Sequence, residues 1–135
     1  MRPILCVGES FEERRQGIEL DFAVGQVRDV TRDLNEDEAA KLIVAYEPVW
    51  AIGTGMVATP DSAQDAAQAI RADLRKTFNE HVANSVRILY GGSVTSKNAA
   101  ELIEEPDVDG FLVGGASLDA NEFASICRIA AGSKA

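Results

Sequence analysis

The sequence predicts an α/β protein in which four strands of a parallel sheet alternate with helices. Four short runs are almost continuous in Ile, Val, Leu and aromatic residues, as expected for strands covered on both faces, at residues 3–7, 42–46, 86–90 and 110–113. Helical patterns lie between and after these runs, and such alternation is typical of parallel sheets with right-handed crossovers. These patterns fit a small open sheet with helices on both faces or half of an eight-stranded barrel, and they do not separate the two.

Length and composition narrow the class of protein. The 135 residues have the length of one domain, assigned here to residues 1–135, and can bury their own core. No apolar run approaches the roughly 20 residues needed to cross a bilayer, and the start Met1-Arg2-Pro3 leads directly into the first strand, so we expect neither membrane association nor a secretory peptide. A net charge of −9 argues against nucleic acid or an anionic membrane as a partner.

The cysteine and histidine content bears on compartment and cofactors. Cys6 and Cys127 are far apart in sequence, and each lies in apolar surroundings. We therefore expect buried free thiols in a reducing compartment, which means a cytoplasmic location. With a single histidine and no Cys/His cluster, we expect no metal and no cofactor.

The first helix is predicted by apolar residues that recur at three- and four-residue spacing, with Asp and Arg on the other face. Gly25 weakens this helix by about 1 kcal/mol relative to Ala, so it depends on packing. Asn35 and Glu38 have the spacing of a capping box that opens a short turn before the second strand. The predicted apolar stripe consists of Leu20, Ala23, Val24, Val27, Val30 and Leu34.

Later helices also have recognisable start signals. Thr59 is predicted as the N-cap of a long helix, with Pro60 at its first position. A shorter helix is predicted at about residues 96–104. Asp119 is predicted as the N-cap of the last helix, paired with Glu122 in a capping box.

The carboxyl ends of the predicted strands carry the residues of chemical interest. Glu47 ends the second run and Pro48 stops it, and a loop with Trp50, Gly53 and Gly55 follows. A carboxylate at a strand end followed by a Gly-rich loop is typical of a general base with a movable cover in α/β enzymes. An isolated Glu-Pro is more often a solvated surface acid, so the rest of the chain has to decide between the two interpretations.

Two glycine pairs follow the third and fourth strands, at residues 91–92 and 114–115. Glycine lets backbone N–H groups approach an anion closely, and a short helical turn predicted at residues 116–118 adds a partial positive charge. Tight strand-to-helix turns also use glycine. Two such pairs at successive strand ends, beside a Gly-rich loop, favour a phosphate site that needs no Lys or Arg.

These residues carry a family resemblance. Residues 46–55 read Tyr-Glu-Pro-Val-Trp-Ala-Ile-Gly-Thr-Gly, which resembles the catalytic-loop signature of triosephosphate isomerase. Residues 5–9, 90–94 and 109–118 resemble that family in the same order and at its spacing. The resemblance covers essentially this whole chain but only about half of a (β/α)₈ barrel of roughly 250 residues. It implies the C-terminal half of a TIM barrel, with strands five to eight as four parallel βα units, completed by self-association.

The resemblance also implies residue roles. Glu47 is expected to be the general base that moves a proton between two carbons of a triose phosphate, interconverting glyceraldehyde 3-phosphate and dihydroxyacetone phosphate. Tyr90 and Ser93 are expected to latch the closed loop, and Arg14 to support the scaffold. The loop hinge is expected at Pro48, Val49 and Trp50, and the phosphate on the backbone N–H groups of Gly53, Ser93, Gly114 and Gly115.

The family also needs a Lys on its first strand and a neutral His on its fourth, and neither has a counterpart here. His81 is expected to be an ordinary surface or helix-cap histidine. The chain alone is therefore expected to be inactive or very weak, and active only with a complementary N-terminal half. The alternative is a non-catalytic half-barrel that associates with itself as a homo-oligomer, most simply a dimer.

Overall fold

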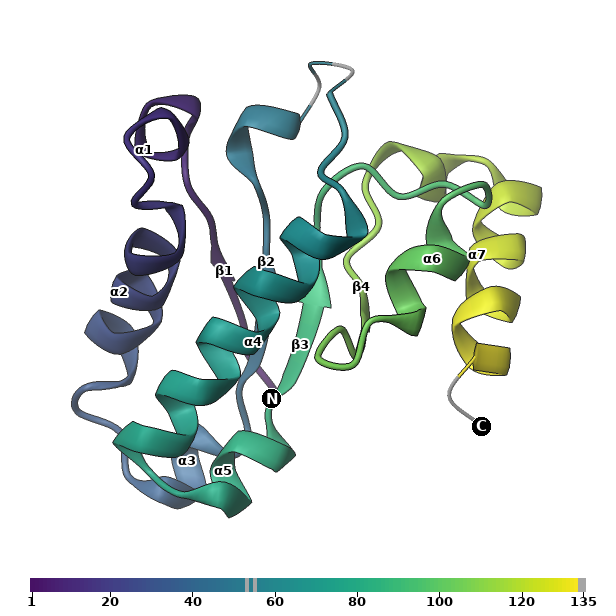
Figure 1. Ribbon diagram of the computed structural model, residues 1–135. Coiled ribbons are helices and arrows are strands. Elements are labelled where there is room, and N and C mark those ends of the chain that lie inside the picture. The colour runs from purple at the N-terminus through teal and green to yellow at the C-terminus, as the bar shows by residue number, and fades with distance from the viewer. Residues whose placement is uncertain (53, 55, 134–135) are drawn as a thin grey trace.

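A computed structural model describes residues 1–52, 54 and 56–133 of the chain. The four predicted strands form one parallel sheet in the order β1-β2-β3-β4 (Figure 1). Each strand lies within its predicted run, and the fourth is the shortest. The strands are β1 Ile4–Val7, β2 Ile43–Tyr46, β3 Arg87–Tyr90 and β4 Gly110–Phe111.

The helices follow the strands as the alternation predicts. The α-helices are α1 Phe11–Arg15, α2 Glu19–Thr31, α3 Glu36–Ala39, α4 Pro60–Thr77, α5 Glu80–Ser85, α6 Ala99–Glu104 and α7 Ala120–Ser133. Two 3₁₀ helices, η1 Val49–Ala51 and η2 Gly115–Leu118, follow β2 and β4. No helix among the described residues is both long and apolar enough to cross a membrane.

Local capping explains where several helices begin. The Thr59 side chain accepts a hydrogen bond from the backbone N–H of Ser62, with Pro60 at the first position of α4, as predicted. Asn35 and Glu38 form the predicted capping box at α3. Asp119 also accepts backbone N–H bonds at the start of α7, but Glu122 does not complete a box there.

The carboxylate of Glu122 instead accepts hydrogen bonds from the Ser96 backbone N–H and hydroxyl, at 2.6 and 3.0 Å. Ser96 lies in the loop before α6, which begins at Ala99 rather than at the predicted residue 96. Glu122 therefore ties the α6 and α7 segments together. The side chain of Glu122 contacts Ser96 in place of the backbone of Asp119, the capping-box contact that its spacing predicted.

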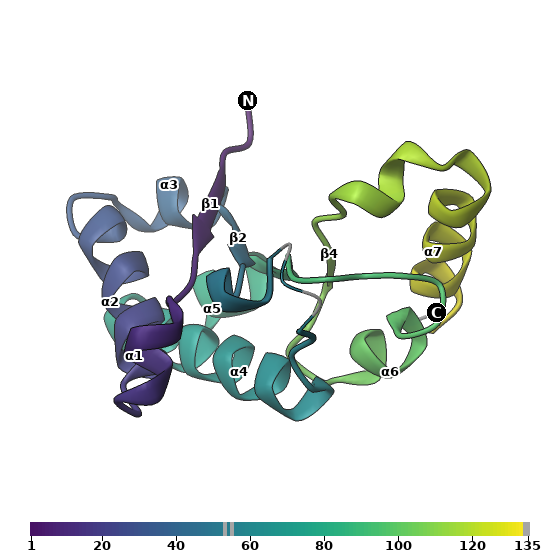
Figure 2. The same ribbon diagram turned by 90° about the horizontal axis from the view of Figure 1, so that it is seen from above.

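The core lies between the sheet and its helices. Alternate strand residues, including Val7, Val44 and Ile88, face this core, where α4 contributes Ile70 and Leu74. Figure 2 shows α2, α4, α6 and α7 on one side of the sheet. The long helices thus cover one face, as packed layers in α/β folds require for a buried sheet face.

The opposite face of the sheet, here called the open face, carries Ile4, Cys6 and Arg87. Register pairing places Ile4 beside Ile43 and Ile43 beside Arg87. Ile4 is 45% exposed and Cys6 is also exposed. The expectation of burial on both faces is therefore wrong for β1, and so is the expectation of buried thiols. β2 is buried on both faces, since Ala45, which pairs with Cys6 in the register, is fully buried.

The predicted stripe of α2 is only partly buried. Ala23 and Val27 are fully packed, but Val30 is 51% exposed and Leu20 is exposed as well. Thr31 takes the buried position instead, where its hydroxyl donates to the Val27 carbonyl at 2.9 Å. The helix contacts α4 and β1, and its buried residues are Ala23, Val27 and Thr31.

A buried arginine links α4 to the segments around β3 and β4, and the sequence pattern did not indicate it. Arg71 donates through Nε to Asp107 at 2.8 Å and through an NH2 group to Asp109 at 2.6 Å. The other guanidinium nitrogen donates to the carbonyls of Ala83 and Val86. The carboxylate of Asp109 also accepts from the backbone of β3. This cluster fixes α4 against the amino-terminal end of β3.

Candidate active site

Backbone hydrogen bonds between neighbouring strands continue past the carboxyl ends of the strands and keep the residues that follow in register. The Glu47 N–H donates to the Val7 carbonyl, and the Gly91 N–H donates to the Tyr46 carbonyl, each at 2.7 Å. Glu47 and Gly91 therefore lie next to each other at the edge where substrates bind in parallel α/β folds. The sequence prediction that Glu47 stands at the end of β2 agrees with this arrangement.

Two glycines make room for Glu47. A Cβ atom on Gly8 would lie 1.7 Å from the Glu47 carbonyl oxygen, and one on Gly91 would lie 2.5 Å from Glu47 Cγ. Real Cβ atoms essentially never approach that closely. Glycine at both positions is therefore a steric requirement, and the half-buried Glu47 is held from both sides. The sequence predicts Gly91 only as part of an anion loop, because its contact with Glu47 arises from the pairing of β2 with β3.

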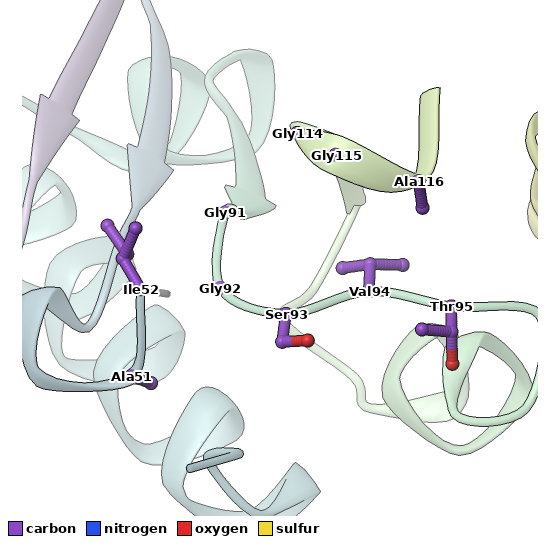
Figure 3. A pocket seen from close by; sticks show the side chains of 10 residues that line it. All are labelled: Ala51, Ile52, Gly91, Gly92, Ser93, Val94, Thr95, Gly114, Gly115 and Ala116. Atoms are coloured by element: carbon purple, nitrogen blue, oxygen red, sulfur yellow. The ribbon is translucent and has the colours of Figure 1, made fainter. Parts of the chain in front are cut away.

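A pocket of about 300 Å³ lies beside this glutamate, between the loops that follow β2, β3 and β4 (Figure 3). None of the described residues that line it is Lys or Arg. Glu47 is adjacent to the pocket through Gly91 and is not itself a lining residue. The lining consists of Ala51, Ile52, Gly91, Gly92, Ser93, Val94, Thr95, Gly114, Gly115 and Ala116.

The structure therefore brings together Ser93, Gly114 and Gly115, three residues that the resemblance places on phosphate. Gly114 and Gly115 lead into η2, the short helical turn that the sequence predicted. A Cβ on either glycine would meet no described atom within 4 Å. Packing within the described chain thus does not require glycine at these two positions. Gly53, the fourth predicted phosphate residue, lies outside the described residues.

The loop after Glu47 starts with Pro48 and the short 3₁₀ helix η1. Pro48 is buried, and the exposed Val49 donates its backbone N–H to the Glu9 carbonyl at 3.0 Å. Trp50 follows within η1, and Thr54 donates its hydroxyl to the Trp50 carbonyl at 2.9 Å. The three predicted hinge residues therefore lie directly between Glu47 and the pocket residues Ala51 and Ile52.

The buried carboxylate of Glu9 binds Trp50 in the segment that follows Glu47. Glu9 is fully buried, and its Oε1 atom accepts hydrogen bonds from the Tyr46 hydroxyl at 3.0 Å and from Trp50 Nε1 at 2.7 Å. An Arg14 nitrogen lies 3.6 Å from the same oxygen. Such donors are what a buried carboxylate requires to remain in a protein core. The expected scaffold role of Arg14 agrees with this contact.

The Glu9 carboxylate and its neighbour Arg14 set the environment of Tyr46 and Trp50. Burial, and then the Glu9 carboxylate, raise the pKa of Tyr46 far above its usual range, so its hydroxyl stays a donor. The Arg14 guanidinium also lies over the Trp50 ring, 4.4 Å from its centre, as in a cation–π pair. The sequence placed Glu9 at the strand edge, but its partners are 5 to 41 positions away and carry no shared local motif.

Tyr90, the predicted latch, lies at the end of β3 with its hydroxyl against Gly92. A Cβ on Gly92 would be 2.2 Å from that hydroxyl, so Gly92 gives it space. Burial raises the pKa of Tyr90, and the backbone of Ala58 partly offsets this rise. Within the described part of the chain, the hydroxyl has no hydrogen bond of ordinary length. The hydroxyl lies beside the backbone of Ala58, which follows the loop in sequence.

Cys6 lies on the open face beside the same glutamate. Partial desolvation and then the Glu47 carboxylate raise the pKa of the Cys6 thiol. His81, in contrast, is an exposed residue of α5, at the opposite end of the strands from the pocket (Figure 1). The expectation that His81 stands apart from the site is consistent with this position.

Comparison with known proteins then identifies the family. The family model described as triosephosphate isomerase matches residues 1–130. The chain belongs to the triosephosphate isomerase family. Triosephosphate isomerase of Bifidobacterium longum (strain DJO10A) is 82% identical over 130 residues, which is 96% of this chain and 49% of that protein.

More distant members match in the same way. The enzyme of Bifidobacterium adolescentis is 75% identical over 129 residues, 96% of this chain and 49% of its own length. That of Nocardia farcinica is 49% identical over 132 residues, 98% of this chain and 51% of its own length. The chain thus spans about half the length of the curated relatives it matches.

Proposed function

We propose that this chain supplies the general base and phosphate-binding loops of a triosephosphate isomerase, as the half of the barrel that contains strands five to eight. The reaction is the interconversion of glyceraldehyde 3-phosphate and dihydroxyacetone phosphate. One observation carries the proposal: the pocket unites Ser93, Gly114 and Gly115 beside Gly91, which touches Glu47. The proposed phosphate site and the strand-end carboxylate would thus share one edge of the sheet.

The phosphate end of the substrate is assigned to backbone N–H groups. Ser93, Gly114 and Gly115 line the pocket, and their backbone N–H groups are proposed to bind the phosphate, with Gly53 as a fourth on closure of the loop. The start of η2 adds the partial positive charge of a helical turn. Backbone donors suit this chain because its net charge of −9 disfavours an anion at long range.

Glu47 is proposed to remove a proton from one carbon of the triose phosphate and to return it to the neighbouring carbon. The enediolate formed between these steps needs an electrophile to stabilise its oxygen. In this family that group is a neutral histidine paired with the glutamate. The resemblance finds no counterpart of this His, or of the family Lys, among the 135 residues. Loss of such stabilisation typically lowers a rate by about 10²–10³-fold or more.

Pro48, Val49 and Trp50 are proposed to form the hinge of the loop, and Tyr90 with Ser93 its latch. The position of the Tyr90 hydroxyl beside the Ala58 backbone supports this assignment, because Ala58 follows the loop in sequence. In the described structure the indole N–H of Trp50, one of the proposed hinge residues, donates a hydrogen bond to Glu9.

The open face and the two edge strands support assembly with further strands. β1 and β4 each have one neighbour in the sheet, and exposed edges of this kind pair readily with other strands. We propose that a complementary N-terminal half, or a second copy of this chain, completes the barrel, in the cytoplasm. A complementary half would restore the Lys and His, whereas a homodimer would not.

A complementation experiment tests the catalytic proposal. The 135-residue polypeptide is assayed for glyceraldehyde 3-phosphate turnover alone and after refolding with the N-terminal half of the Bifidobacterium longum relative. We expect little turnover alone and clear turnover in the mixture. Glu47→Gln should lower the latter by at least 10²-fold, because general bases typically contribute that much. The exposed Glu101→Gln on α6 is the matched control.

Turnover that survives Glu47→Gln unchanged would refute the role of Glu47. The second candidate function, a non-catalytic half-barrel that associates with itself, is favoured by the exposed Ile4 on the open face. Light scattering of the purified 135 residues distinguishes it: a stable homodimer that gains no activity with the added half supports this alternative. A compact, well-folded monomer rejects self-association.

A further inference from the structure

A second pocket lies at the amino-terminal ends of the strands, opposite the candidate active site. Its volume is about 490 Å³, and its lining residues are Arg2, Asp37, Ala40, Lys41, Ser85 and Arg87. Figure 1 shows α3, α5 and the N-terminal end of the chain gathered at this end of the sheet. Nothing in the proposed reaction uses this pocket. It is called the basal pocket below.

Strand register brings its basic residues together. Ile4 pairs with Ile43, and Ile43 with Arg87. The hydrogen bonding between β1 and β2 continues past the amino-terminal end of β1, because the Ile43 N–H donates to the Pro3 carbonyl at 3.1 Å. Neighbouring strands lie about 4.8 Å apart. Arg2 lies two positions before Ile4, and Lys41 lies two positions before Ile43. The two basic residues are therefore on adjacent segments of the backbone.

The three basic side chains of the basal pocket form no ion pair with a carboxylate of the described residues. Across the described ranges, no carboxylate forms an ion pair with Arg2, Lys41 or Arg87, although seven other ion pairs are formed. Asp37 is the only acidic residue among the described lining residues, so the lining carries a net charge of +2. The whole chain carries −9, so the net charge of this lining is opposite in sign to that of the chain.

Helix ends account for only part of this charge pattern. α3 and α5 end at Ala39 and Ser85, next to the basal pocket, and helix C-termini favour nearby cations. Each end supplies at most about half a negative charge, and less in helices this short. A positive excess therefore remains. Arg2, Lys41 and Arg87 are exposed and line one pocket, so their like charges repel one another and a bound anion would relieve this repulsion.

We propose that the basal pocket is an anion site for a small phosphate-bearing molecule, separate from the substrate pocket. Two guanidinium groups suit the oxygens of a phosphate, and an ammonium group adds a point charge. A phosphate monoester carries about two negative charges at neutral pH, which matches the net charge of the lining. The volume exceeds that of phosphate alone and leaves space for an organic group. Ser85 also lines the pocket, but its hydroxyl donates to the His81 carbonyl at 2.7 Å and is not assigned to the anion.

Chemical-shift titration of the isotope-labelled chain with inorganic phosphate tests this site, at low salt and against equal ionic strength of sodium chloride. Backbone amides at residues 40–41 and 85–87 report on the basal pocket, and those at residues 93–95 and 114–116 report on the substrate pocket. We expect saturable shifts at the first group. Lys41→Gln and Arg87→Gln should each weaken that binding about tenfold, as expected for loss of one charge-assisted contact. Shifts at the substrate pocket should be unchanged.

Arg128→Gln on α7 removes the same charge elsewhere and should leave the basal affinity unchanged. The proposal is overturned if residues 40–41 and 85–87 show no saturable shift beyond the chloride control. It is also overturned if the double variant Lys41→Gln/Arg87→Gln binds phosphate there as well as the original chain. Because the two groups of amides are read separately, failure at one pocket is distinguishable from failure at the other.

Discussion

Trp50 Nε1 donates a 2.7 Å hydrogen bond to the fully buried carboxylate of Glu9. This bond joins the segment after β1 to the first turn of the loop that follows Glu47. Tyr46 and Arg14 contact the same carboxylate oxygen, so one buried charge organises the base of the loop. The position of the loop in this structure therefore depends on a contact made outside the pocket.

Replacing Trp50 with Phe should destabilise the fold by about 1–3 kcal/mol, the usual cost of removing a donor from a buried charged acceptor. The aromatic ring over Arg14 is kept, so the change isolates the indole N–H. Urea unfolding followed by circular dichroism is the suitable measurement, because Trp50 is the only tryptophan in the sequence. Val49→Ala, at an exposed neighbouring position, should unfold at an almost unchanged urea concentration. Equal midpoints for Trp50→Phe and the original chain would contradict the role of the bond.

The environment of Cys6 predicts a pH-dependent reactivity. Desolvation and the Glu47 carboxylate raise the pKa of its thiol, so less thiolate is present at a given pH and alkylation is slow. Glu47→Gln removes the negative charge, which lowers this pKa and should speed iodoacetamide alkylation several-fold near pH 8. The rate is measured by mass spectrometry in a Cys127→Ser background. The exposed substitution Glu36→Gln is the control, and an identical rate profile in Glu47→Gln would show that the two side chains do not interact.

Local signals in the sequence were sufficient for the strands and for the start of α4. The apolar runs and the Thr59-Pro60 pair depend on nearest neighbours in the chain, and both predictions are confirmed. The exposure of Val30, and of Ile4 on the open face, depends on which elements pack where, and no local pattern reports that. The steric need for Gly91 is of the same kind, since it arises only when β2 and β3 are side by side.

Arg71 provides a test of the cluster that no pattern indicated. Its side chain is 11% exposed and contacts two carboxylates and three carbonyl oxygens. Arg71→Met would leave Asp107 and Asp109 without their cation, and breaking a buried pair in this way typically costs about 3–5 kcal/mol. Urea unfolding at fixed protein concentration measures the loss. Arg75→Met, one turn along the same helix in an exposed pair with Glu80, should change the midpoint little. A similar effect of both variants would mean that burial of the pair is unimportant.

Two glycine-to-alanine substitutions should have effects of opposite sign. In Gly8→Ala the new Cβ would lie 1.7 Å from the Glu47 carbonyl oxygen, so β1 and β2 must separate at the edge that carries the general base. Overpacking that forces a backbone shift typically costs about 1–3 kcal/mol or more. Gly25 lies inside α2 and has no described atom within 4 Å of an added Cβ. Gly25→Ala should therefore stabilise the fold by about 0.5–1 kcal/mol, because alanine restricts the unfolded chain more than glycine does. Thermal unfolding of both variants is the measurement. A stable Gly8→Ala variant with unchanged Cys6 alkylation would show that the contact between Gly8 and Glu47 does not position the carboxylate.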